Sequence, residues 1–216
     1  MNSLSNSRAY KAFLFDMDGT LLNSAASAER VWGDWARRHG LDVPAFLRTM
    51  HGRRSEDTIR DSGVRGLDIA AEARAITAAE IDDTAGTVEI AGARTFLAAL
   101  PASAWTIVTS ASRALAQARL KAAGLPLPPL MITAEDISRG KPDPEGYLLA
   151  AERLGAAPGD CLVFEDAVPG VRAGAAAGAD VIVIGGHAYP PHARARDYAR
   201  LSVTIADGLL ELHGLQ

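Results

Sequence analysis

The sequence predicts an α/β fold, with a Rossmann-like parallel sheet covered by helices and a helical segment inserted after the first strand. Two observations predict it. Short apolar runs alternate with stretches of helical spacing, which is typical of βαβ units. The stretch from Ser24 to Ile90, in contrast, contains no convincing strand run and shows only helical spacing.

The apolar runs are the candidate strands of the sheet. They are Ala12–Phe15, Trp105–Val108, Leu130–Ile132, Cys161–Phe164, Val181–Ile184 and Val203–Ile205. Candidate helices lie between the later runs, at Ala93–Leu100, Arg113–Ala123, Pro144–Leu154 and Pro169–Ala177. Gly124, Gly155 and Gly178 follow three of these helices, where a C-terminal cap favours a residue that tolerates positive φ. We therefore expect Ala93 to Ile205 to form one βαβ series.

The inserted segment repeats its apolar residues at helical intervals, as in Ala25, Ala28, Trp32 and Trp35. Its alanine-rich part is consistent with this, because alanine is a strong helix former. The predicted division is a Rossmann-like core of residues 1–23 and 91–216 and a helical cap of residues 24–90.

Composition excludes several classes of protein. The 216 residues are 48% hydrophobic and carry a formal net charge of −4, so we expect a globular protein that does not bind nucleic acid. A single cysteine, Cys161, excludes an internal disulfide and indicates a reducing compartment. Met1 to Tyr10 do not resemble a signal peptide, and no run approaches the ~18 apolar residues of a membrane span. We expect a cytoplasmic protein without a membrane partner.

The first apolar run ends in Asp16-Met17-Asp18-Gly19-Thr20. Ligands of open α/β sheets bind at the carboxyl ends of the strands, and two carboxylates this close repel each other unless a cation or a proton compensates. Oxygen ligands favour Mg²⁺. The alternative is that Asp16 and Asp18 only begin a turn, for which Gly19 supplies the freedom of backbone conformation.

Polar residues also follow two other runs. Thr109 and Ser110 precede a helix, where hydroxyl and N–H groups can bind phosphate, although Ser and Thr are also common helix N-caps. Lys141 lies in the stiff sequence Gly-Lys-Pro-Asp-Pro, where it could neutralise a phosphate and a carboxylate or simply be an exposed lysine. Glu165 and Asp166 form a second acidic pair at a strand end. Chance rarely places acids, hydroxyls and a lysine at successive strand ends.

These residues resemble the motifs of haloacid-dehalogenase (HAD) superfamily phosphatases. Asp16 to Leu21 is similar to the nucleophile motif, Ser110 to the second motif, Lys141 to the third and Phe164-Glu165-Asp166 to the fourth. The resemblance implies a Rossmann-like core with a helical cap, Mg²⁺ as cofactor, a monomeric catalytic unit and a small phosphorylated metabolite as substrate.

The resemblance also implies a role for each matching residue. Asp16 would be the nucleophile and a metal ligand. Asp18 would be the general acid and then the general base, and would bind Mg²⁺ through its backbone carbonyl. Ser110 would bind the phosphoryl group, with Thr109 as the alternative hydroxyl if the register differs by one. Lys141 would hold Asp16 and the phosphate together, and Asp166 would complete the metal ligands.

The predicted reaction is hydrolysis of a sugar or polyol phosphate through an aspartyl-phosphate. Family members of the beta-phosphoglucomutase type carry a cap histidine shortly after the first motif, whereas this chain has Ala25-Ala26-Ser27-Ala28. A mutase therefore remains the alternative, as does a non-catalytic phosphate-binding or signalling protein. The motif usually continues to an Asp where this chain has Asn23, a change that we expect to be tolerated.

The predicted cap contains His51-Gly52-Arg53-Arg54, which resembles a cap segment of glycerol-3-phosphatases and 2-deoxyglucose-6-phosphatases. His51 and Arg54 are the predicted substrate-binding residues, because charged and polar groups on such a loop can grip a phosphate or sugar hydroxyls. The alternative is an ordinary turn with solvated arginines.

Overall fold

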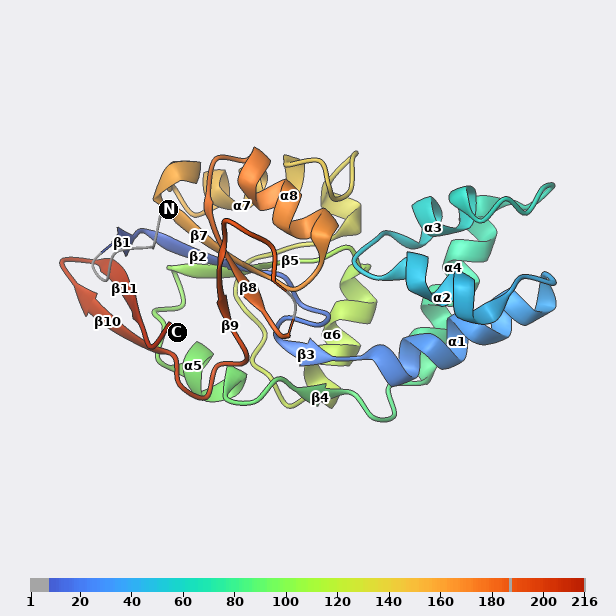
Figure 1. Ribbon diagram of the computed structural model, residues 1–216, viewed down its shortest axis with the longest axis horizontal. Coiled ribbons are helices and arrows are strands. Elements are labelled where there is room, and N and C mark those ends of the chain that lie inside the picture. Colours follow the sequence, from blue (N-terminus) through green and yellow to red (C-terminus); the bar gives the residue numbers. More distant parts are fainter. Residues whose placement is uncertain (1–7, 187, 216) are drawn as a thin grey trace.

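The computed structural model of the chain describes residues 8–186 and 188–215, so most of the polar N-terminal segment, residues 1–7, lies outside the described part. A six-stranded parallel sheet forms the centre of the molecule (Figure 1). In spatial order its strands are β6 (Met131–Ile132), β5 (Trp105–Val108), β2 (Ala12–Phe15), β7 (Cys161–Glu165), β8 (Asp180–Ile184) and β9 (Ala193–Ala195).

The direction of winding reverses at β2. From β2 the chain proceeds to β5 and β6 on one side and returns to β7, β8 and β9 on the other. Phe15 of β2 pairs with Ile107 of β5 and Phe164 of β7, so the three strands end close together. Such a switch point is where open α/β sheets bind ligands.

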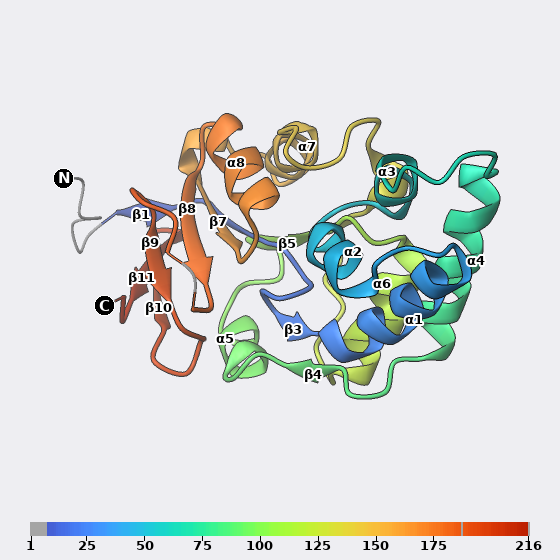
Figure 2. The ribbon, with the colours of Figure 1, turned by 45° about the vertical axis from the view of Figure 1, so that its right-hand side comes forward.

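Helices cover both faces of the sheet (Figures 1 and 2). Successive side chains of a strand point to opposite faces, so β2 contributes Phe13 and Phe15 to one core and Leu14 to the other. The first core is rich in aromatic residues and is completed by α5 (Ala93–Ala98) and α6 (Arg113–Ala122). The second is packed by α7 (Glu145–Arg153) and α8 (Val168–Ala176). The predicted fold class is thus confirmed.

One strand expectation is wrong. Val203–Ile205 does not join the parallel sheet but lies in β10 (Ser202–Ala206), which pairs antiparallel with β11 (Leu209–His213) beside β1 (Ala9–Tyr10). The turn between β10 and β11 is Asp207-Gly208, with φ of 52° and 76°, and consecutive positive φ values favour a tight hairpin. The sixth parallel strand is instead β9, whose sequence Ala-Arg-Ala carries no apolar run.

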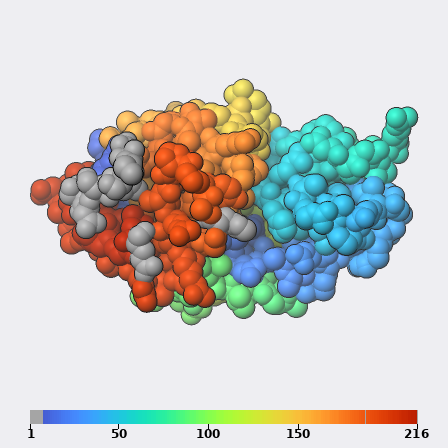
Figure 3. All heavy atoms as spheres, viewed as in Figure 1, coloured from blue at the N-terminus to red at the C-terminus, as the bar shows by residue number. Residues whose placement is uncertain are grey.

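Residues between β3 (Leu22–Asn23) and β4 (Val88–Glu89) form a separate helical lobe, which we define as α1 (Ala25–Arg38), α2 (Val43–Met50), α3 (Ser55–Asp61) and α4 (Ile69–Asp82). It extends from one end of the molecule, shown from blue to cyan in Figure 3. The antiparallel pair β3–β4 carries both connections to the sheet. Two short 3₁₀ helices lie at Ala134–Asp136 and Pro158–Asp160.

The helical lobe has a hydrophobic core of its own. Trp35 is fully buried there and packs against Trp32 and Phe46, with ring centroids at 5.9 and 5.3 Å. The indole nitrogen of Trp35 donates to Glu72 at 2.8 Å, which satisfies its only polar group. Within the described residues, no helix has the length and apolar character needed to span a membrane.

We predict that Trp35→Ala destabilises the protein by about 3–5 kcal/mol, because it removes the largest buried side chain of the lobe and leaves a cavity. Urea denaturation followed by circular dichroism measures the effect. Leu148→Ala, at a side chain that is 41% exposed, serves as the control and should change the free energy of unfolding by less than about 0.5 kcal/mol. Equal effects of the two changes would contradict the packing described for Trp35.

Candidate active site

Polar residues gather at the carboxyl ends of the three central strands. Asp16 follows β2, Thr109 and Ser110 follow β5, and Asp166 follows β7. All four line a cavity of about 270 Å³ between the sheet edge and the helical lobe. The predicted convergence of these strand ends is therefore what the structure shows.

Lys141 joins the acids of β2 and β7. Its side chain, 6% exposed, places Nζ 2.5 Å from Asp16 Oδ1 and 2.6 Å from Glu165 Oε1. It also donates to the backbone carbonyl of Val108 at 3.2 Å, so three acceptors surround the ammonium group. The alternative of an exposed loop lysine is wrong.

Glu165 holds the ammonium group of this lysine in place. Its carboxylate accepts from the Tyr147 hydroxyl at 2.8 Å and from the backbone N–H of Asp166 at 3.1 Å. A Cβ on Gly170 would lie 1.7 Å from Glu165 Oε1, which explains why α8 carries a glycine at that position. Glu165 is thus a fixed, fully buried partner of Lys141.

Burial and neighbouring charges together shift the pKa values of Lys141 and Asp16. Burial acts to lower the pKa of Lys141, but the carboxylates of Asp16 and Glu165 outweigh it and raise that pKa, so the ammonium stays charged. Burial and the charge of Glu165 raise the pKa of Asp16 well above its usual range, although Lys141 opposes them. One cation does not balance the acids around it.

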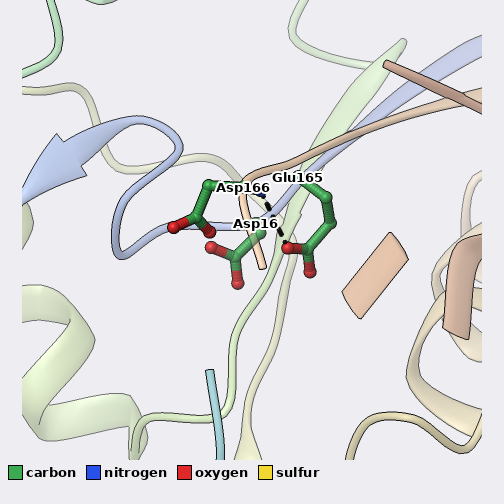
Figure 4. Close-up of side chains that lie close together, drawn as sticks. All are labelled: Asp16, Glu165 and Asp166. Atoms are coloured by element: carbon green, nitrogen blue, oxygen red, sulfur yellow. Dashed lines mark hydrogen bonds between the residues drawn. The ribbon is translucent and has the colours of Figure 1, made fainter. Parts of the chain in front are cut away.

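Asp166 completes a cluster that suits a metal ion. Ligand atoms of Asp16, Glu165 and Asp166 lie within 4.8 Å of one another, and Figure 4 shows the three carboxyl groups together. Burial and the charge of Glu165 raise the pKa of Asp166 to about 7. A divalent cation would offset this uncompensated negative charge, and an all-oxygen donor set is one that Mg²⁺ prefers. The residues present therefore fit a divalent metal.

Gly19 allows Asp166 to approach the first motif. Its φ is +89°, and a Cβ there would lie 2.0 Å from Asp166 Oδ2, so only glycine fits. The neighbouring Thr20 hydroxyl donates to Asp166 Oδ1 at 3.3 Å. Close approach of the two strand ends thus depends on this turn.

Asp18 lines the same cavity, but its side chain is not part of the three-carboxylate cluster. Ser24 donates to its Oδ1 at 2.5 Å, and Arg119 of α6 lies 3.0 Å from its Oδ2. The carboxylate is therefore held by its own partners. The sequence predicts that Asp16, Asp18 and Asp166 converge on one metal ion, but the clustered carboxylates are those of Asp16, Glu165 and Asp166, which leaves the backbone carbonyl of Asp18 as its predicted contribution.

The two candidate hydroxyls differ in their contacts. Ser110 donates to the backbone carbonyl of Gly52, in the turn after α2, at 3.1 Å. Thr109 is buried, and its Oγ1 accepts from the backbone N–H of Ala111 at 3.1 Å. Ser110 thus contacts the helical lobe, whereas Thr109 supports its own loop, and the choice between them as the motif hydroxyl stays a prediction.

The predicted substrate-binding residues His51 and Arg54 differ in their position relative to the cavity. His51 and Arg53 line it, and Arg53 pairs with Asp61. Arg54 is absent from that lining and pairs with Asp57 at 2.9 Å. It also donates to the carbonyl of Ser138 at 3.2 Å, in the loop that leads to Lys141. Substrate binding by Arg54 stays a prediction. In the structure Arg54 connects the helical lobe to the loop that precedes Lys141.

Sequence reasoning missed three residues of the site: Glu80, Arg119 and Tyr147. Each lies in a helix, where the sequence shows only an ordinary polar or aromatic residue. Arg119 could have been suspected from its helical spacing, because it shares a face with the buried Leu115 and Ala116. Glu80 and Tyr147 carry the same signal, because Glu80 shares a helix face with the buried Ala73 and Ile76, and Tyr147 shares one with the buried Ala150 and Ala151.

Comparisons with known proteins agree with this geometry. The model of the haloacid dehalogenase-like hydrolase family matches residues 10–178. Hexitol phosphatase A of Escherichia coli (strain K12) is 45% identical over 185 residues, covering 84% of this chain and 86% of that protein. The 2-deoxyglucose-6-phosphate phosphatase 2 of Saccharomyces cerevisiae is 35% identical, covering 79% and 78%. CbbY of Rhodobacter sphaeroides, solved with phosphate, has the same fold, with a TM-score of 0.75, 22% identity and coverage of 88% and 95%.

The raised pKa of Asp166 predicts a pH dependence of stability in metal-free protein. Because the folded-state pKa is about 7 and the unfolded one is about 4, the native state binds more protons between these values. The free energy of unfolding, measured by urea denaturation in EDTA, should therefore fall by more than about 1 kcal/mol from pH 5 to pH 7.5.

Asp166→Asn should remove part of this fall, because an amide does not titrate whereas the buried carboxyl group of Asp16 still does. Asp34→Asn, at an exposed helix position, should leave the fall unchanged. The same slope in wild type and in Asp166→Asn would show that Asp166 is not the responsible group.

Proposed function

Because the chain belongs to the haloacid dehalogenase-like hydrolases and is a phosphatase, we propose that it hydrolyses a sugar or polyol phosphate through an aspartyl-phosphate on Asp16. One observation carries this proposal: the Asp16 carboxylate faces the cavity at the switch point of the sheet, 2.5 Å from the buried ammonium of Lys141. A carboxylate held in this way is a defined nucleophile beside a cation that attracts phosphate.

The proposed reaction has two steps. A carboxylate oxygen of Asp16 attacks phosphorus, and the bond to the substrate oxygen breaks. Asp18, in the same cavity, gives a proton to that oxygen. Asp18 then takes a proton from water as the water oxygen attacks phosphorus, which releases inorganic phosphate and restores Asp16. Ser110 and Lys141 bind the phosphoryl oxygens during both steps.

We propose Mg²⁺ as the metal, held by Asp16, Asp166 and the backbone carbonyl of Asp18. The support is the cluster of oxygen donors and the negative charge that Lys141 leaves unbalanced. When bound, Mg²⁺ supplies positive charge to the phosphoryl oxygens.

The substrate proposal rests on the relatives and on the cavity. Hexitol phosphatase A and 2-deoxyglucose-6-phosphate phosphatase 2 are named for phosphorylated polyols or sugars. Trp32, His51 and Arg53 line the lobe side of the cavity, and its volume of about 270 Å³ suits a small metabolite. An aromatic face and polar groups are suited to bind hydroxylated carbon chains.

We propose further that residues 24–90 act as a cap over the cavity. The support is the lobe's separate hydrophobic core and its two connections through β3 and β4. Gly92, with φ of +83°, follows the second connection and packs against the backbone of Ala199. It can serve as one end of a hinge.

The alternative reactions are not favoured. Ala25 and Ala28 line the cavity, and the stretch Ala25–Ala28 that follows the first motif contains no histidine that could transfer a proton. A non-catalytic binding protein would not need Asp16, Asp18 and Lys141 together beside one cavity.

We predict that Asp16→Asn lowers kcat by more than about a thousandfold, because an amide cannot form the aspartyl-phosphate. Release of inorganic phosphate from sorbitol 6-phosphate measures the loss, and circular dichroism checks the fold. Asp160→Asn, a partly exposed position outside the cavity, should retain full activity. Substantial turnover by well-folded Asp16→Asn protein would refute the proposed nucleophile.

We also predict that EDTA abolishes phosphate release and that added Mg²⁺ restores it, because the clustered acids repel both one another and the substrate phosphate when no cation is bound. In the same assay, glucose 1-phosphate should yield phosphate and no glucose 6-phosphate. Full activity in excess chelator would remove the metal from the proposal, and efficient isomerisation would favour the mutase.

A further inference from the structure

A buried chain of charges connects the helical lobe to Asp18. Arg119 belongs to α6. Its Nη1 lies 3.0 Å from Asp18 Oδ2, and its Nη2 lies 2.8 Å from Glu80 Oε1. The side chains of Arg119 and Glu80 are only 6% and 4% exposed. Glu80 belongs to α4 of the lobe, so one guanidinium bridges a lobe residue and a residue of the first motif.

Packing alone does not require these charges. Burying an arginine and a glutamate costs desolvation energy that their attraction only partly repays, and apolar residues of similar size often serve stability as well. Arg119 Nε is also buried without a hydrogen-bond partner among the described residues. The arrangement therefore points to a role for the guanidinium other than stability.

The contacts of Asp18 indicate that role. Ser24 donates to Oδ1 at 2.5 Å, and Arg119 holds Oδ2, so both carboxylate oxygens have a fixed partner. Ser24 is the N-cap residue of α1, yet its hydroxyl makes no capping bond to the helix and contacts Asp18 instead. Two partners from different elements restrict the torsion angles of a side chain far more than one does.

We propose that Arg119 is a positioning residue that aims the Asp18 carboxyl group at the substrate's leaving oxygen, and that Glu80 holds Arg119 in place from the helical lobe. This inference rests on the proposed function, because it assigns the proton transfer to Asp18. It adds that the transfer depends on the lobe through a buried ion pair.

Leaving-group dependence tests the inference. An alkyl phosphate such as sorbitol 6-phosphate expels a strongly basic oxygen that needs a proton, whereas p-nitrophenyl phosphate expels a stable phenolate that does not. The value of kcat/KM reports the step in which Asp16 is phosphorylated and the leaving group departs. A misplaced Asp18 should therefore lower kcat/KM for the alkyl ester far more than for the aryl ester.

Glu80→Gln and Arg119→Lys are the variants that disturb positioning. Arg119→Lys keeps the charge but cannot bridge two carboxylates with a planar fork. We expect each to lower kcat/KM for sorbitol 6-phosphate by about 10- to 100-fold and for p-nitrophenyl phosphate by less than about threefold. Asp18→Asn, which removes the proposed general acid itself, is the reference. It should lower kcat/KM for sorbitol 6-phosphate more than these variants do, and again far more than for p-nitrophenyl phosphate. Lys121→Met, an exposed cation on the same helix, is the matched control and should change neither value.

Loss of fold is separated from loss of positioning by the double variant Arg119→Met/Glu80→Met. It removes both buried charges together, so neither is left unpaired. Urea denaturation should show a fold close to wild type in stability, and the selective loss on sorbitol 6-phosphate should persist.

Equal losses of kcat/KM on both esters would overturn the inference, since they would assign Arg119 to phosphate binding or to general structure. Unchanged values for both would overturn it as well. Failure of the proposed function has a different signature: wild-type protein would release no phosphate from either ester, or Asp16→Asn would remain active.

Discussion

The site is organised around one buried ammonium group. Lys141 lies between Asp16 and Glu165, within 2.5 and 2.6 Å of their carboxylate oxygens, and is almost completely shielded from water. A lysine at this depth remains charged only because two acids face it. Replacing Lys141 by a neutral residue would leave the acids without their cation in a region of low dielectric, which is strongly destabilising. Thus Asp16 and Glu165 depend on Lys141 for compensation of their charge.

This charge cluster lies at the middle of the sheet, where the strand ends are shielded from water. β2 lies between β5 and β7, and helices shield both faces, so the ends of these strands are largely removed from water. Close approach then requires glycine at two points, Gly19 beside Asp166 and Gly170 beside Glu165. The sheet supplies burial, and the two glycines supply the space in which acids can meet a lysine.

The helical lobe meets the site through polar contacts. Gly52 accepts a hydrogen bond from Ser110, and Glu80 reaches Asp18 through Arg119. The first contact involves a proposed phosphate ligand and the second the proposed general acid. The residues proposed to handle the phosphoryl group and the leaving oxygen are therefore both linked to the lobe by polar contacts.

The fold class, and the position of Asp16, Ser110, Lys141 and Asp166 at successive strand ends of one sheet, could be predicted from the order of residues in the chain. This is possible because each lies at or near the end of a strand or before a helix, and such local patterns survive folding. The ion pairs of Arg119 with Asp18 and Glu80, in contrast, could not be predicted from local patterns. These residues are far apart in the chain, and long-range packing of α4 on α6 brings them together. The same reason explains β9, a strand recognisable only because β8 pairs with it.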